Sequence, residues 1–90
     1  MLKNLEDLIK TIRDRKKSSK DNSYTNKLLN DKNLSVSKVK EEITELIEAV
    51  EKNSNKVHES ADVIYHLLVY LEANNIKIED VMDEIEKRKK

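Results

Sequence analysis

Apolar residues recur along the chain at the spacing of amphipathic helices, and polar stretches divide them into segments. Near the start, leucine and isoleucine return every three or four residues, which predicts a first helix over residues 2–15. The polar, aperiodic stretch that follows predicts a loop over residues 16–23. A short mixed segment at 24–29 and a second polar break at 30–33 come next. The first third of the chain therefore predicts one helix followed by a loop region.

The strongest periodicity lies in the middle of the chain, in two longer segments. Ser35 or Ser37 can cap a helix whose apolar stripe continues to about residue 52. The next helix is expected over about 55–75, and its residues 63–71 contain one non-apolar residue, His66. A helix that is apolar on nearly every side must be buried all round. In so small a chain, that requires neighbours from a second subunit.

The last helix has an apolar face within residues 78–85, and residues 87–90 follow as a basic tail. Its acidic first turn and basic end suit the helix dipole. The chain has neither proline nor glycine and is rich in lysine, glutamate, leucine and isoleucine, which favours helix throughout. We therefore predict one all-α domain over residues 1–90. Its core would be an antiparallel helical hairpin within a small bundle of about four helices.

Composition limits how this domain becomes stable and what it can do. With 37% apolar and 3% aromatic residues, a chain of 90 residues buries a thin core, so homodimerisation is expected to complete the fold. The absence of cysteine excludes disulfides, thiolate nucleophiles and cysteine-bound zinc, and the absence of glycine excludes glycine-rich phosphate loops. The apolar runs are too short to cross a membrane and the start of the chain lacks a signal-peptide pattern, so a cytoplasmic location is expected.

The 18 basic and 18 acidic side chains cancel overall but are unevenly distributed. A net charge of zero argues against a nucleic-acid-binding protein, which needs a strongly basic domain. Residues 1–40 carry 11 basic and 5 acidic side chains, whereas residues 41–62 carry 2 basic and 7 acidic ones. A basic front half beside a compact acidic segment suits a protein that binds a polyphosphate with one part and a metal ion with the other.

The acidic segment contains two pairs of carboxylates at helical spacing. Glu42 and Glu45 lie three residues apart on one helix, and Glu59 and Asp62 repeat that spacing on the next. The intervening residues are enough to end one helix, turn and return antiparallel, so the pairs can face each other. Converging carboxylates without cysteine or histidine suit Mg²⁺ or Mn²⁺. Acids at this spacing are more commonly solvated beside lysines, but Glu59 and Asp62 fall in the helix that should be most buried.

These acids resemble the metal signature of the all-α nucleotide pyrophosphohydrolases, the MazG-like superfamily. The pattern is E-E-x-x-E followed by E-x-x-D, here Glu41, Glu42, Glu45, Glu59 and Asp62. Three flanking segments make the chain similar to the phosphoribosyl-ATP pyrophosphohydrolase family of histidine biosynthesis: S-Y-T-x-K-L-L at 23–29, K-V-x-E-E at 38–42 and A-D-x-x-Y-H-L-L-V at 61–69. Lys32 and Lys40 stand where that family usually has glycine.

The resemblance implies an enzyme that hydrolyses phosphoribosyl-ATP to phosphoribosyl-AMP and pyrophosphate with Mg²⁺, or Mn²⁺, as cofactor. The catalytic carboxylates would be Glu41, Glu42, Glu45, Glu59 and Asp62. The last four would bind the metal, and Glu41 would be a further ligand, a neighbour of a ligand, or the base for the attacking water. Contacts to the nucleotide substrate are expected from Ser23, Tyr24, Thr25, Lys27, Lys38 and Arg15.

Two histidines accompany these residues. His66, one turn beyond Asp62, is expected to orient Asp62 rather than to bind metal. His58, immediately before Glu59, is expected to be solvated. Without the resemblance, Tyr24 would be interpreted as a packing residue with a hydrogen-bonding hydroxyl, and the lysines named above as surface residues.

Two alternatives stay open from the sequence. One is a housecleaning nucleoside triphosphate pyrophosphatase of the same superfamily, which residues 23–25 and 65–66 alone distinguish from the leading interpretation. The other is a non-catalytic helical dimerisation module whose acids are merely solvated. Only a metal-binding protein gains melting temperature when Mg²⁺ is added, so thermal melting separates the second alternative from the first two interpretations.

Overall fold

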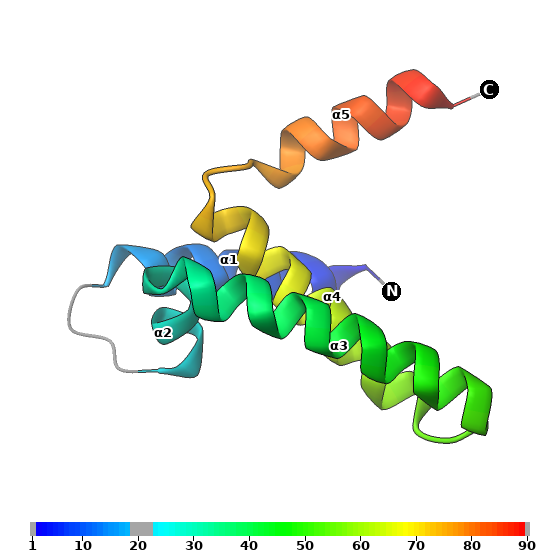
Figure 1. Cartoon of the computed structure of the whole chain (residues 1–90). Coiled ribbons are helices and arrows are strands. Elements are labelled where there is room, and N and C mark those ends of the chain that lie inside the picture. Colours follow the sequence, from blue (N-terminus) through cyan, green and yellow to red (C-terminus); the bar gives the residue numbers. More distant parts are fainter. Residues whose placement is uncertain (1, 19–22, 90) are drawn as a thin grey trace.

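The computed structural model describes residues 2–18 and 23–89, and all regular structure within these two stretches is helical. The helices are α1 (Lys3–Lys17), α2 (Tyr24–Asn30), α3 (Lys32–Lys52), α4 (Lys56–Ala73) and α5 (Ile78–Arg88) (Figure 1). The predicted all-α fold is confirmed. The predicted number of about four helices becomes five in the described residues, because the mixed segment after the first loop is itself a short helix, α2.

The polar break expected at residues 30–33 is reduced to a single residue, Asp31. Its extended backbone ends α2, and its carboxylate accepts a 3.0 Å hydrogen bond from the backbone N–H of Leu34, which caps α3. The prediction of a cap at Ser35 or Ser37 is therefore wrong. Ser35 lies inside α3 and is buried, because the helix begins one turn earlier.

The other helix ends differ from the predicted ones by one or two residues. α1 continues to Lys17, two residues into the loop predicted at 16–23, whose residues 19–22 lie outside the described stretches. At the other end of the chain, α5 continues to Arg88 and so includes part of the basic tail expected at 87–90.

Asparagine serves at the turns of this glycine-free chain. Among the described residues, Asn53, Asn55 and Asn75 have positive φ angles of 52°, 56° and 60°. Asparagine tolerates this left-handed conformation better than most residues with a side chain. Asn53 and Asn55 lie in the connection between α3 and α4, so the chain reverses direction within three residues.

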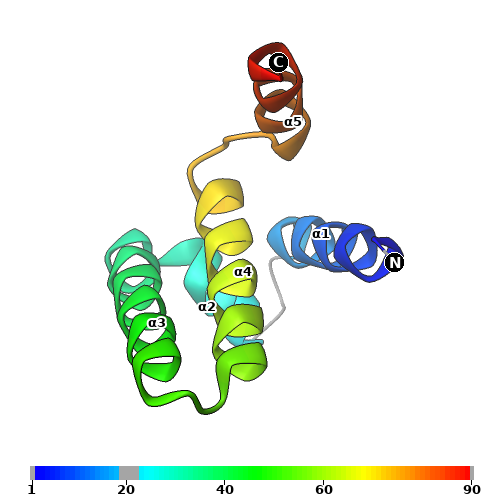
Figure 2. The same ribbon diagram turned by 90° about the vertical axis from the view of Figure 1, so that its right-hand side faces the viewer.

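α3 and α4 lie side by side and run in opposite directions, with more extensive contact than any other pair of helices (Figure 2). α4 also contacts α1, α2 and α5, so it is the central helix of the chain. α1 lies on the side of α4 opposite α3, and α5 extends away from the other four helices (Figures 1 and 2).

The buried apolar core joins α1, α2 and the C-terminal half of α4. Its residues are Ile12, Leu28, Leu29, Val69 and Ala73. The expectation that α4 is buried all round is not met within one chain, because Ile64 is 49% exposed and Leu67 is 42% exposed. α3 likewise exposes Ile43 and Ile47. None of the described helices combines the length and the apolar character needed to cross a membrane.

Candidate active site

Three glutamates meet between α3 and α4. Glu42 and Glu45 of α3 and Glu59 of α4 each offer a carboxylate oxygen, and these oxygens lie within 4.8 Å of one another. Glu42 and Glu45 are one turn apart on the same side of α3, and the antiparallel return of α4 brings Glu59 against them. The structure thus brings together three of the four predicted metal ligands.

Two of these glutamates are poorly solvated and incompletely hydrogen-bonded. Glu42 is 8% exposed and the side chain of Glu59 is 17% exposed. Among the described residues, the buried side-chain oxygens without a hydrogen-bond partner are Oε2 of Glu42 and Oε2 of Glu59. A buried carboxylate oxygen without a partner is costly unless a cation neutralises it. This distinguishes the group from acids that are simply solvated.

Burial and the neighbouring carboxylates raise the proton affinity of Glu42 and Glu59. Burial raises the pKa of Glu42 above its usual value, and the neighbouring Glu45 carboxylate raises it further. Burial also raises the pKa of Glu59, and the closely approaching carboxylate of Glu45 raises it further. Like charges held together away from water favour uptake of a proton or of a metal cation. The arrangement is therefore suited to binding positive charge.

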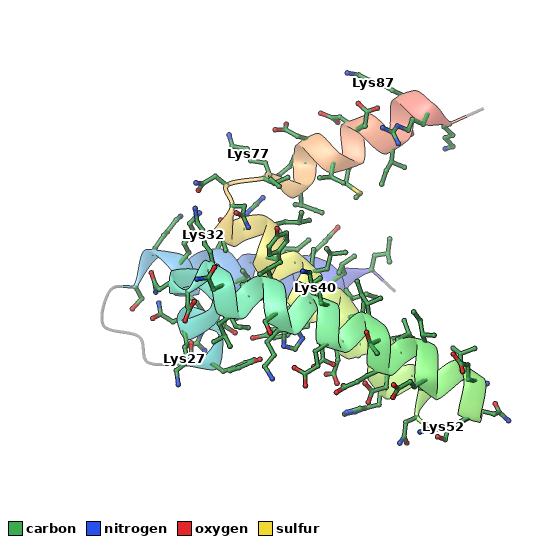
Figure 3. All side chains as sticks on the ribbon, in the orientation of Figure 1. Lys27, Lys32, Lys40, Lys52, Lys77 and Lys87 are labelled. Atoms are coloured by element: carbon green, nitrogen blue, oxygen red, sulfur yellow. The ribbon has the colours of Figure 1, made fainter. Side chains whose placement is uncertain are left out.

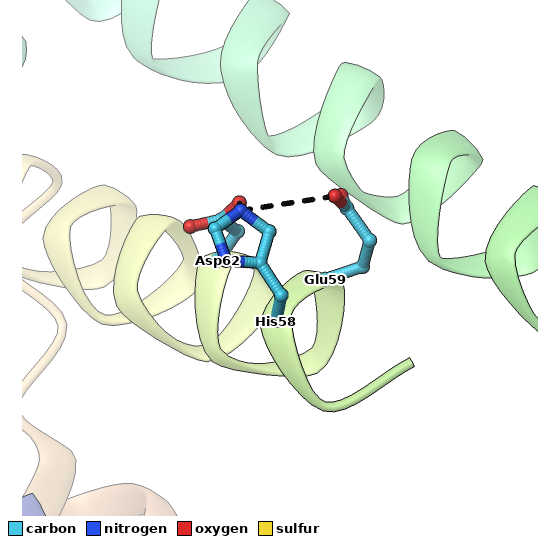
Figure 4. Close-up of side chains that lie close together, drawn as sticks. All are labelled: His58, Glu59 and Asp62. Atoms are coloured by element: carbon cyan, nitrogen blue, oxygen red, sulfur yellow. Dashed lines mark ion pairs between the residues drawn. The ribbon is translucent and has the colours of Figure 1, made fainter. Parts of the chain in front are cut away.

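Asp62, the fourth predicted ligand, belongs to a second group with His58 and Glu59 (Figure 4). Nε2 of His58 lies 3.3 Å from Oδ2 of Asp62 and 4.0 Å from Oε1 of Glu59. The His58 side chain is 72% exposed, as expected, but its ring nitrogen approaches the acids instead of being fully solvated. Sequence reasoning missed this contact, although the four-residue spacing of His58 and Asp62 on a helix could have indicated it. Glu59 is the residue that the two groups share.

Glu41 lies outside both groups. It is exposed, and its carboxylate is 3.1 Å from Nζ of Lys38, one turn earlier on α3. This hydrogen-bonded ion pair raises the pKa of Lys38 above its usual value. The structure therefore brings Glu41 to a lysine rather than to the converging carboxylates.

His66 connects the acidic region to α2. The hydroxyl of Tyr24 is 2.9 Å from Nε2 of His66, and Nδ1 of the same ring is 2.8 Å from the backbone oxygen of Asp62. Because a carbonyl oxygen can only accept, Nδ1 carries the proton, and in the neutral ring Nε2 accepts from the tyrosine. His66 thus contacts Asp62 through the backbone, whereas the carboxylate of Asp62 faces His58.

The predicted substrate-binding segment is held firmly at the start of α2. The Ser23 hydroxyl accepts a 3.1 Å hydrogen bond from the backbone N–H of Asn26 and so caps the helix. The Thr25 hydroxyl is hydrogen-bonded to that of Tyr65, and the rings of Tyr24 and Tyr65 stack with centroids 6.4 Å apart. These contacts fix α2 against α4.

Tyr24 also lies within the electrostatic reach of α3. Burial raises the pKa of Tyr24 above its usual value, the charge of Lys38 acts in the opposite direction, and the carboxylate of Glu42 raises it again. Tyr24, Lys38 and Glu42 come from two helices that sequence spacing could not place relative to each other. The substrate-binding and metal-binding candidates therefore adjoin one another.

The remaining cationic candidates lie toward the periphery. Lys27 extends from the exposed side of α2 (Figure 3). Arg15 is near the end of α1, and its backbone oxygen accepts a 3.0 Å hydrogen bond from Nδ2 of Asn26 on α2. Lys40, which replaces the glycine expected before the acidic pair, is exposed on α3, and Lys32 is the first residue of that helix. Neither lysine occupies the space between α3 and α4.

Known proteins resemble this chain over most of its length. The family model of phosphoribosyl-ATP pyrophosphohydrolase matches residues 5–89. A phosphoribosyl-ATP pyrophosphatase of Clostridium novyi (strain NT) is 46% identical over 92 residues, which cover 96% of this chain and 81% of that protein. The protein of that name from Bacillus cereus (strain AH187) is 43% identical over 86 residues, covering 90% and 78% respectively. The one from Halobacterium salinarum (strain ATCC 29341 / DSM 671 / R1) is 37% identical over 91 residues, covering 94% and 96%. The chain belongs to the phosphoribosyl-ATP pyrophosphohydrolase family.

Proposed function

We propose that this chain is an enzyme that hydrolyses phosphoribosyl-ATP to phosphoribosyl-AMP and pyrophosphate, a step of histidine biosynthesis. Membership of the family and the names of its relatives support the activity and the substrate. The observation that carries the proposal in the structure is the convergence of Glu42, Glu45 and Glu59, two of which have a buried oxygen without a partner. Hydrolysis of a phosphoanhydride depends mainly on positioning and on neutralising charge.

The acidic group fits a divalent metal ion. Glu42, Glu45 and Glu59 would hold the ion, and Asp62 would add a carboxylate from the next turn of α4. Mg²⁺ is the preferred candidate, with Mn²⁺ as an alternative, because these donors are all oxygens. When bound, the ion neutralises the phosphate charge and lowers the pKa of a coordinated water. The two unpaired oxygens of Glu42 and Glu59 would then be satisfied.

The substrate would lie between the acidic group and α2. Of the proposed contacts, the ring of Tyr24 is more available than its hydroxyl, because His66 accepts from that hydroxyl. Lys38 is close to both Tyr24 and Glu41, so it can reach a phosphate group while Glu41 limits its movement. The further contacts proposed from the sequence are Ser23, Thr25, Lys27 and Arg15. Of the three roles considered for Glu41, we propose that it accepts a proton from the attacking water.

We also propose that the active enzyme is a homodimer. Ile43, Ile47, Ile64 and Leu67 leave 42% to 53% of their surface exposed on the adjoining helices α3 and α4. A contiguous surface of such exposed apolar residues would be an interaction surface. Each subunit would then be a single domain of residues 1–90, in the cytoplasm, where the nucleotide substrate is expected.

A pyrophosphate-release assay with phosphoribosyl-ATP, ATP and deoxynucleoside triphosphates tests this proposal. We expect release from phosphoribosyl-ATP in Mg²⁺, loss of release in EDTA, and a decrease of about 100-fold or more in Glu42→Gln and in Asp62→Asn. Glu51→Gln is the matched control, because Glu51 is an exposed acid on α3 outside both groups. Equal turnover of ordinary triphosphates would favour the housecleaning enzyme, and no release from any of them would favour the dimerisation module.

A further inference from the structure

We infer that His58, Glu59 and Asp62 form a site for a late first-row transition ion such as Zn²⁺ or Co²⁺, with His58 as its nitrogen ligand. The site overlaps the proposed Mg²⁺ site at Glu59 and Asp62 but differs from it in its chemistry. The inference deepens the proposed function and rests on it for the role of the shared acids. Its test, however, is direct metal binding rather than catalysis.

The spacing of the ligand atoms matches a small four-coordinate ion. Two donors that each lie about 2.0–2.1 Å from a tetrahedral ion are about 3.3–3.4 Å apart, and Nε2 of His58 is 3.3 Å from Oδ2 of Asp62. A charge-assisted hydrogen bond between such atoms would be shorter, about 2.7–2.9 Å. Oε1 of Glu59 is 4.0 Å from the same nitrogen. That distance needs to close by about 0.6 Å, which side-chain rotation can supply.

The backbone already presents the three side chains together. His58 and Asp62 are separated by one helical turn, so they project from the same side of α4. Figure 4 shows the His58 ring lying against the Asp62 carboxylate, with the Glu59 carboxylate facing both. Because all three belong to the first two turns of one helix, metal binding requires no rearrangement of the fold.

Two unpaired carboxylate oxygens indicate that this region lacks positive charge. Oε2 of Glu59 is buried without a hydrogen-bond partner. Glu42, 8% exposed, has an unpaired Oε2 of its own and converges on Glu59 from α3. The 72% exposed ring of His58 contacts Asp62 and leaves both of these oxygens without a partner. A cation at Oε1 of Glu59 would therefore neutralise a carboxylate whose other oxygen, Oε2, the protein leaves without a partner.

Histidine nitrogen determines which ion such a site prefers. Imidazole suits zinc, cobalt and nickel, whereas Mg²⁺ favours oxygen donors. The chain has two histidines and no cysteine. Both ring nitrogens of His66 are engaged, by Tyr24 and by the backbone of Asp62, so His58 is the histidine that can bind. A transition ion held there would also occupy Glu59 and Asp62 and would compete with Mg²⁺.

Titration of the metal-free protein with Co²⁺, followed by the visible absorption of the ion, tests this inference. We expect Co²⁺ to bind the wild type, and His58→Gln to weaken that binding by about tenfold or more while the Mg²⁺ affinity, measured by calorimetry, is unchanged. Val57→Gln is the matched control, because it introduces the same side chain into the same turn at a residue that is 85% exposed. It should leave both affinities as in the wild type.

Two results would overturn the inference. Equal Co²⁺ affinity in the wild type and in His58→Gln would show that His58 is not a ligand. An equal loss of Co²⁺ and Mg²⁺ affinity in His58→Gln would show that the residue acts on the acids in general and confers no selectivity. Pyrophosphate release by the wild type in Mg²⁺ is a separate measurement, so its failure would remove the proposed function without deciding the Co²⁺ result.

Discussion

The hydroxyl of Tyr24 donates to Nε2 of His66 over 2.9 Å and links the short helix α2 to the central helix α4. The same ring donates from Nδ1 to the backbone oxygen of Asp62, 2.8 Å away. Since His66 is 6% exposed, water has little access to its ring nitrogens. Two hydrogen bonds therefore connect the segment proposed to contact substrate with the helix that bears Glu59 and Asp62.

Removing the Tyr24 hydroxyl should destabilise the fold. In Tyr24→Phe, Nε2 of His66 stays buried without its donor, and a buried polar group without its partner costs about 1–3 kcal/mol. We expect urea denaturation to show a free energy of unfolding lower by that amount. Tyr70→Phe is the control, because it removes a hydroxyl from α4 that takes no part in this contact. Equal stability of Tyr24→Phe and the wild type would show that the bond contributes nothing.

Neutralising Glu42 should have opposite effects with and without metal. Glu42→Gln removes a buried charge beside Glu45, so the metal-free variant should melt at a higher temperature than the metal-free wild type. Mg²⁺ at about 100 times its Kd should stabilise the wild type by about 2.7 kcal/mol, and the variant much less. Differential scanning calorimetry in EDTA and in Mg²⁺ measures both effects. A wild type that is indifferent to Mg²⁺ would contradict the metal site.

The raised pKa values of Glu42 and Glu59 determine the sign of a pH effect. In the unfolded chain glutamate titrates near its usual pKa of about 4.3, so between that pH and the raised values the folded state binds more protons. The stability of the metal-free protein should therefore fall as the pH rises through this interval. The stability difference between Glu42→Gln and the wild type should widen in the same interval. A difference that is constant with pH would rule out the raised pKa of Glu42.

Sequence spacing could predict the acidic group because a helix fixes where residues three apart project. The positions of Glu42, Glu45 and Glu59 follow from two helices and a short turn. Sequence spacing could not show that the Asp62 carboxylate lies beside His58, or the Glu41 carboxylate beside Lys38. These contacts depend on side-chain rotamers and on local charge.

Helix α2 shows how far the fold could be predicted from the sequence. Seven residues are too few to show a helical period, and an isolated helix of that length would not be stable. α2 forms because Ser23 caps it and because Leu28 and Leu29 are buried in the core. The burial of Leu28 and Leu29 depends on contacts with distant parts of the chain, so the sequence pattern alone indicated a mixed segment.

The attachment of α5 gives a further prediction. α5 extends away from the other helices (Figure 1), and its Glu79 forms a 2.5 Å hydrogen bond with Nη2 of Arg13 on α1. We expect Arg13→Gln to increase hydrogen exchange in α5 more than in α4, because this bond to α1 is lost. Lys10→Gln, at an exposed position on the same helix, should leave exchange in α5 unchanged.

Acid should weaken the same attachment in the wild type. The hydrogen bond from Arg13 lowers the pKa of Glu79 below its usual value, so the folded state holds this carboxylate charged at a pH where the unfolded chain would protonate it. The stabilisation is complete above the unfolded value of about 4.3 and is lost as the pH falls through the lowered pKa. Exchange in α5, corrected for its intrinsic pH dependence, should rise in the wild type over that interval and stay constant in Arg13→Gln. A parallel rise in both proteins would mean that another group holds α5 in place.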